Sequence, residues 1–164
     1  MTVKGFVYAG NVEDERVEVV NKSLFDVTKE DIADCDVMIS AYGSGFDADP
    51  TLNHKAFLKY IELNEGTKRH LIAIGGAGSL FTDSTHTTYC YETPEHPDFL
   101  REISKNIKLG IDELKKTSDV NWTVVCPSSF FDSEGALTGN YEIGTEEQVI
   151  FNEAGESRVT YEDL

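Results

Sequence analysis

Three short segments rich in glycine, serine and proline follow apolar runs, and their residue types suit the binding of a ligand. They are Ser40-Ala41-Tyr42-Gly43-Ser44-Gly45, Gly75-Gly76-Ala77-Gly78-Ser79 and Pro127-Ser128-Ser129-Phe130-Phe131. Glycine lets backbone amides approach a phosphate closely, as in nucleotide-binding loops. Each segment alone fits an ordinary turn, because Gly, Ser and Pro dominate turns. Together, after three successive strands, they favour a ligand cleft.

None of the three segments matches a phosphate-binding motif. The pattern G-x-G-x-x-G needs a third glycine in register, which both Gly43-Ser44-Gly45 and Gly76-Ala77-Gly78 lack, and the chain has no Gly-Lys-Ser/Thr. It also has no G-x-S-x-G, which disfavours a serine hydrolase. Without His-x-x-x-His or Cys-x-x-Cys, no metal site is predicted. No residue receives a catalytic assignment from these patterns.

Apolar runs alternate with amphipathic ones along the chain. The runs at residues 3–9, 16–20, 36–41, 71–74 and 122–126 predict strands. Helical spacing predicts helices at 53–64 and 99–116, and Thr28 has the features of an N-cap that starts another helix. Residues 82–97 predict a long loop, and 141–143, 149–151 and 158–160 predict short strands. This alternation indicates an α/β, Rossmann-like, mostly parallel sheet with helices on both faces.

Composition narrows the classes of partner. The 164 residues predict one domain, 1–164, and the formal charge of −16 argues against nucleic acid and anionic membranes. No apolar stretch approaches the ~20 residues of a membrane span. The three cysteines have no metal-type spacing and fit a reducing compartment, so we expect a cytoplasmic protein.

Three segments carry a family resemblance. "IAIGGAGSL", "DVNWTVVCPSSFF" and "TGNYEIG…GESRVTYEDL" resemble the NmrA-like, NAD(P)H-binding branch of the atypical short-chain dehydrogenases, which includes the NADH-flavin reductase type. The resemblance extends from about residue 3 to residue 164. It implies a Rossmann sheet that binds NAD(P)H and a small-molecule substrate.

The resemblance also implies which positions contact the cofactor. Ala41, Tyr42 and Gly43 would lie by the pyrophosphate and ribose, and Gly75 and Gly76 by the nicotinamide ribose. The remaining candidates are Pro127, Ser128, Ser129 and Phe130 on the nicotinamide, Ser23 with Leu24 at the adenine position, and Lys105 or Lys108 at the ribose hydroxyls. The two lysines equally fit a solvated helix face, which is where lysine usually lies.

The sequence also departs from the family pattern. Relatives open with a strand, a glycine-rich turn and a helix, whereas this chain starts at their second strand and stops before their closing helix. We therefore expect an unpaired sheet edge, and a homo-oligomer formed through it. The chain has no Tyr-x-x-x-Lys pair, and Gly10 stands where many relatives place an arginine.

Three functional hypotheses remain from the sequence. The first is an NAD(P)H-dependent oxidoreductase that transfers a hydride to a flavin or quinone, with both rings oriented by the protein. The second is a non-catalytic nucleotide-sensing or protein-interaction module, which the missing Tyr-Lys pair favours. The third is a truncated relative that no longer binds a cofactor.

Overall fold

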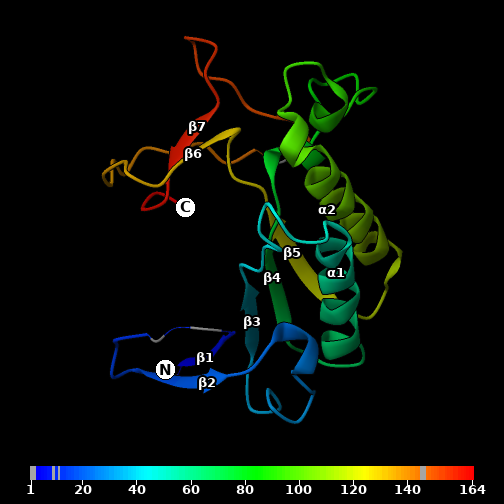
Figure 1. Ribbon diagram of the computed structural model, residues 1–164, viewed down its shortest axis with the longest axis vertical. Helices are drawn as coiled ribbons and strands as arrows, with labels where there is room; N and C mark the ends of the chain where they lie inside the picture. Colours follow the sequence, from blue (N-terminus) through cyan, green and yellow to red (C-terminus); the bar gives the residue numbers. More distant parts are fainter. Residues whose placement is uncertain (1–2, 9, 11, 145–146) are drawn as a thin grey trace.

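The computed structural model of the chain describes residues 3–8, 10, 12–144 and 147–164 (Figure 1). Its strands are β1 (Val3–Val7), β2 (Val17–Asn21), β3 (Val37–Ser40), β4 (His70–Ile74), β5 (Asn121–Val125), β6 (Phe130–Asp132) and β7 (Arg158–Thr160). Its α-helices are α1 (Thr51–Asn64) and α2 (Asp98–Lys116). Short 3-10 helices lie at Leu24–Asp26, Ala77–Ser79 and Cys90–Glu92.

The strands form three separate parallel sheets. The central sheet has the order β3-β4-β5, and β1-β2 and β6-β7 form two-stranded sheets of their own. In the central sheet Met38 is opposite Leu71, and Leu71 is opposite Trp122. This register aligns the carboxyl ends of β3, β4 and β5 along one edge. The predicted α/β class with parallel strands is confirmed.

Helices α1 and α2 lie side by side on one face of the central sheet (Figure 1). They bury a core against Leu71 and Ala73 of β4, formed by Ala56, Phe57, Tyr60, Ile111 and Leu114 with Val120. On β3, Val37 and Ile39 alternate with the core-facing Met38 and stay exposed, Ile39 to 69%. Among the described residues both α-helices thus cover the same face, whereas the sequence predicts helices on both.

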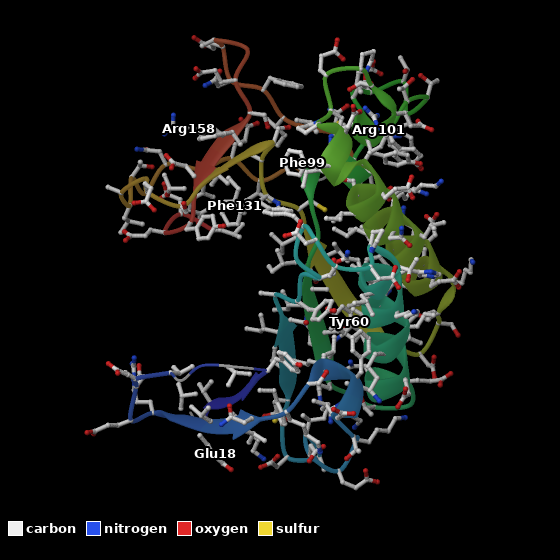
Figure 2. The ribbon with its side chains drawn as sticks, in the orientation of Figure 1. Glu18, Tyr60, Phe99, Arg101, Phe131 and Arg158 are labelled. Atoms are coloured by element: carbon white, nitrogen blue, oxygen red, sulfur yellow. The ribbon has the colours of Figure 1, made fainter. Side chains whose placement is uncertain are left out.

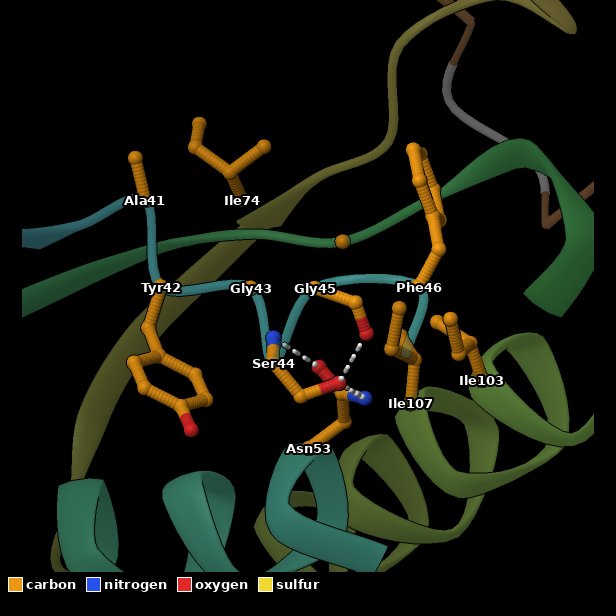
Figure 3. A pocket seen from close by; sticks show the side chains of 11 residues that line it. Ala41, Tyr42, Gly43, Ser44, Gly45, Phe46, Asn53, Ile74, Ile103 and Ile107 are labelled. Atoms are coloured by element: carbon orange, nitrogen blue, oxygen red, sulfur yellow. Dashed lines mark hydrogen bonds between the residues drawn. The ribbon is translucent and has the colours of Figure 1, made fainter. Parts of the chain in front are cut away.

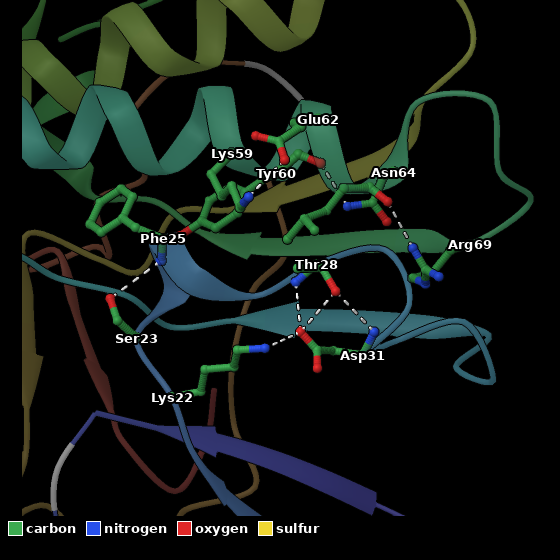
Figure 4. Close-up of polar contacts among 11 residues, drawn as sticks. Lys22, Ser23, Phe25, Thr28, Asp31, Lys59, Tyr60, Glu62, Asn64 and Arg69 are labelled. Carbon is green, nitrogen blue, oxygen red and sulfur yellow. Dashed lines mark hydrogen bonds and ion pairs between the residues drawn. The ribbon is translucent and has the colours of Figure 1, made fainter.

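The prediction of a helix starting at Thr28 is wrong, because residues 29–34 form turns. The amide of Thr28 donates to Asp31 Oδ2 over 2.7 Å, as in a capping box, but no helix follows (Figure 4). The guanidinium of Arg69 explains the difference. It donates to the carbonyl oxygens of Ile32 (2.6 Å) and Cys35 (3.1 Å), which fixes this segment as a turn before β3.

The C-terminal part also differs from prediction. Residues 141–143 and 149–151 form no strand; Gln148 makes one isolated bridge to Phe81. The amides of Thr138 and Gly139 instead donate to the carboxylate of Asp163. The strand predicted at 158–160 is confirmed as β7, and its partner β6 was not predicted.

Candidate functional site

A cavity of about 190 Å³ lies at the carboxyl ends of β3 and β4 (Figure 3). The chain after β3 forms one wall, the start of α1 and the middle of α2 form another, and the end of β4 forms the floor. The lining residues are Ala41, Tyr42, Gly43, Ser44, Gly45, Phe46, Asn53, Ile74, Gly75, Ile103 and Ile107. None of these residues carries a charge, so the cavity suits an uncharged group.

The first turn of α1 holds the wall formed by residues 41–46. Asn53, which is buried, accepts from the amide of Ser44 over 3.3 Å and donates to the Ser44 hydroxyl over 2.8 Å and to the Pro50 carbonyl over 3.1 Å. Gly45 adopts φ +79°, a conformation that favours glycine. Gly43 has no atom within 4 Å of where a Cβ would stand, so its position opens onto free space.

The floor requires a glycine at position 75. A Cβ there would lie 2.7 Å from the Cys126 sulfur and 3.0 Å from Val124 Cγ1, closer than real contacts. The amide of Gly75 donates to the carbonyl of Val125 over 2.8 Å, which extends the pairing of β4 with β5. Burial raises the pKa of the Cys126 thiol, so it stays protonated near neutral pH. The floor is therefore uncharged as well.

Two titratable side chains, Tyr42 of the cavity lining and His96, leave the site without a charge. Burial raises the pKa of the Tyr42 hydroxyl, whose ring meets Phe25 edge to face at 5.6 Å between centroids. His96 Nε2 lies 3.1 Å from the Ser104 hydroxyl, and burial lowers the pKa of His96. At neutral pH both side chains are therefore mainly uncharged. Neither His96 nor Ser104 lines the cavity.

The structure brings several predicted site residues together. Ala41, Tyr42, Gly43 and Gly75 all line the cavity. Gly76 follows directly, and a Cβ there would make an ordinary contact of 3.8 Å with Ile107 Cδ1. Two of the three small-residue segments thus meet at one place.

The third predicted segment lies elsewhere. Pro127, Ser128, Ser129 and Phe130 do not line the cavity, because the chain after β5 leaves to form β6. The amide of Ser129 donates to the Ser157 hydroxyl over 3.2 Å. Phe130 is paired with Arg158 in the β6-β7 sheet and its side chain is exposed. Ser129 and Phe130 therefore meet the C-terminal part of the chain.

The other predicted positions also lie outside the cavity. The Ser23 hydroxyl accepts from the amide of Phe25 over 3.3 Å, capping a 3-10 helix, and Leu24 packs against the core (Figure 4). Lys105 is exposed on α2. Lys108 forms an ion pair with Asp112, and its Nζ lies 4.6 Å from the centre of the Tyr89 ring.

Five lining residues lie outside the three segments singled out from the sequence: Phe46, Asn53, Ile74, Ile103 and Ile107. Ile103 and Ile107 are four residues apart, a spacing that signals one helix face but not what that face covers. Asn53 stands near the start of the predicted helix, and the sequence does not show that its side chain is buried.

Among the described residues, no group of three His, Cys, Asp or Glu is arranged to hold a metal, and none of the helices has the length and apolar character of a membrane span.

Comparisons with known proteins relate the chain to a family and a fold. A family model described as NAD(P)H-binding matches residues 8–161. The uncharacterized protein YwnB of Bacillus subtilis is 33% identical over 156 residues, which are 94% of this chain and 72% of YwnB. The structure of SP1627 from Streptococcus pneumoniae, titled "a putative NADH-flavin reductase", superposes with a TM-score of 0.89 at 33% identity, over 98% of this chain and 76% of SP1627.

A more distant structure supports the fold alone. A protein of Bacteroides thetaiotaomicron is 22% identical and superposes with a TM-score of 0.79, over 98% of this chain and 74% of that one. The matched relatives are longer than this chain, which spans about three quarters of YwnB and SP1627. Since the family model covers nearly all of the sequence, the chain belongs to the NAD(P)H-binding family, with a Rossmann-like fold.

Proposed function

We propose that the chain binds NAD(P)H at the cavity after β3 and β4 and transfers its hydride to a flavin or quinone. The observation that carries the proposal is the uncharged cavity at the carboxyl ends of parallel strands, lined by Ala41, Tyr42, Gly43 and Gly75. Ligands of open α/β sheets bind at this edge. Membership of the NAD(P)H-binding family and the name of SP1627 give the reaction class.

The residues present fit one end of the cofactor. A volume of about 190 Å³ is below the ~300 Å³ at which pockets for whole ligands begin. It therefore suits a flat ring and its sugar. Glycine at 43 and 45 leaves the wall without side-chain bulk, and Ile103 and Ile107 offer an apolar surface to the ring.

The side chains would act by positioning rather than by proton transfer. NAD(P)H supplies the hydride, NAD(P)⁺ leaves, and the acceptor takes up the hydride together with one proton from water. Ile74, Ile103 and Ile107 would keep water from one side of the ring. Asn53, through Ser44, would hold the wall in place. Holding two reactants in a reactive geometry can by itself supply a large rate enhancement.

The test uses Trp122 on β5, the one tryptophan of the chain. Reduced nicotinamide accepts excitation energy from tryptophan, so titration with NADH and NADPH reports binding directly. We expect saturable transfer at micromolar nucleotide, followed by oxidation of the nucleotide when riboflavin or menadione is added. Absence of transfer up to millimolar nucleotide would overturn the proposal.

A pair of variants locates the binding site. Gly43→Leu adds a bulky side chain to a lining position where no atom lies within 4 Å of the Cβ, so we expect nucleotide binding to weaken at least about tenfold, equivalent to ~1.4 kcal/mol. Ala48→Leu is the matched control, because it adds similar bulk to an exposed position of the same segment outside the lining. Equal affinity of the two variants would exclude this cavity as the site.

A further inference from the structure

One large side chain of the cavity lining is mostly exposed. Phe46, in the segment after β3, is 71% exposed, and it lines the cavity together with Ile103 and Ile107 of α2 (Figure 3). An exposed apolar side chain at a cavity is the kind of surface that a ligand covers. A flat ring that fills the cavity therefore contacts Phe46.

The backbone around Phe46 does not fix the position of its ring. The side-chain hydrogen bonds that hold this segment are those of Asn53 with Ser44, two residues before Phe46. The amides of residues 45–48 donate no hydrogen bond to any residue that the structure describes. Gly45 adopts φ +79°, and no atom lies within 4 Å of where its Cβ would stand. Within its own segment, the side chain of Phe46 is therefore free to exchange between rotamers.

The ring of Phe99 holds Phe46 at the cavity. The two rings meet edge to face, with 5.6 Å between centroids and 89° between planes, an arrangement that aromatic pairs prefer. Phe99 is the second residue of α2 and does not line the cavity (Figure 2). It precedes Ile103 by one turn, so it continues the face of α2 that forms the cavity wall. Phe99 thus reaches the cavity through Phe46.

The start of α2, which carries Phe99, is itself held in place. Arg101 donates to the carbonyls of Tyr91 and Thr93. It also donates to the carbonyl of His96, so that it ties the chain before α2 to the first turns of this helix. The helix in turn packs against α1. The aromatic contact therefore joins a fixed ring to a loosely held one, and the fixed ring sets the position of the other.

We propose that Phe46 contacts the reduced nicotinamide ring bound in the cavity, and that Phe99 is a positioning residue that holds Phe46 ready for this contact. The inference rests on the proposed function and adds two residues to its site. Ordering a mobile side chain on binding lowers the affinity by about 2- to 12-fold. An edge-to-face pair favours the ordered position by a similar factor of about 2 to 12. Phe99 therefore raises the affinity for the cofactor without contacting it.

The test measures NADH affinity by energy transfer from Trp122 in a set of variants. Phe46→Ala should weaken NADH binding about tenfold, and Phe99→Ala about fivefold. Phe99→Tyr keeps an aromatic ring at this position and should bind within about twofold of the wild type. Leu109→Ala is the matched control, because it removes an exposed apolar side chain of the same helix outside the lining. Equal affinity of Phe99→Ala and Leu109→Ala would overturn the positioning role.

The double variant separates positioning from a general effect on α2. If Phe99 acts through Phe46, Phe99→Ala should weaken NADH binding no further in the Phe46→Ala background. A purely structural role of Phe99 would weaken binding by the same factor in both backgrounds. That additive result would overturn the proposal.

Reduced nicotinamide mononucleotide identifies the ring that Phe46 contacts, because it carries the nicotinamide and lacks the adenosine half. Its binding should weaken in Phe46→Ala and Phe99→Ala by the same factors as that of NADH. Undiminished affinity in these variants, or absence of binding to the wild type, would overturn the assignment to the nicotinamide ring.

The two proposals fail in different ways in these experiments. A wild type that binds NADH, with Phe46→Ala and Phe99→Ala variants that bind it equally well, refutes the role of the two rings and retains the proposed function. A wild type that shows no energy transfer to NADH refutes the proposed function and this inference with it.

Discussion

The contact between α1 and α2 makes Gly110 a sensitive position. A Cβ at Gly110 would lie 2.4 Å from Cγ, 2.5 Å from Cδ2 and 2.6 Å from Cβ of Phe57. In an open helix, Gly→Ala stabilises by about 1 kcal/mol. Here the conflict includes Phe57 Cβ, which is fixed to the backbone of α1, so the ring cannot simply rotate away. Overpacking costs ~1–3 kcal/mol or more, and we expect Gly110→Ala to lower the free energy of unfolding by about 2 kcal/mol.

Thermal unfolding followed by circular dichroism checks this value. For a chain of this size ~1 kcal/mol corresponds to ~2–4 °C, so Tm should fall by about 4–8 °C. The control is Gly43→Ala, the same substitution where no atom lies within 4 Å, and its Tm should stay close to that of the wild type. A Gly110→Ala protein at least as stable as the wild type would refute the close packing of the two helices.

Three further predictions concern other parts of the molecule. The hydrogen bond and charge of Lys22 and the amide of Thr28 lower the pKa of Asp31 to about 2, below its unfolded value of 3.8. The stability it contributes is therefore present above pH 4 and lost as pH falls toward 2, so the Tm difference between wild type and Asp31→Asn should shrink over that range. Burial raises the pKa of Tyr60 to about 12, although the hydrogen bond that Ser40 donates to its hydroxyl lowers the pKa in part. Because this pKa lies above the unfolded value of 10, denaturant titrations should show the free energy of unfolding falling from pH 10 upward, and falling less steeply in Tyr60→Phe. The predicted homo-oligomer would use the edge of β3 that has no strand partner among the described residues. Sedimentation equilibrium should give a mass above the 18.2 kDa of one chain, and this mass should drop in Ile39→Lys. A monomeric wild type would contradict the prediction of a homo-oligomer.

The sequence predicts those elements whose signal is local. The helix predicted at 53–64 is observed as Thr51–Asn64, and the strand predicted at 71–74 as His70–Ile74. Each of these two segments contains its whole apolar pattern, and its apolar residues are buried in the core between the helices and the central sheet. The segments that follow β3 and β4 could be singled out for the same reason, because small residues come directly after each apolar run.

The features that the sequence does not reveal depend on distant residues. β6 pairs with β7, whose first residue lies 28 positions after the first residue of β6. The turn after Thr28 depends on hydrogen bonds from Arg69, and the sequence of residues 28–35 contains no signal of these bonds. The pairing of Phe46 with Phe99 likewise joins two segments that only the folded chain brings together.

The side chain of Arg69 has a consequence for the order in which the protein opens. Its buried guanidinium donates to carbonyls of Ile32, Cys35 and Leu63, so it joins the turn before β3 to the last turn of α1 and the start of β4. None of these carbonyls can lose its donor without leaving a buried charge short of partners, which is costly. Amide hydrogens of the turn should therefore exchange with solvent together with those at the end of α1, as one cooperative unit, although the turn itself contains no regular secondary structure.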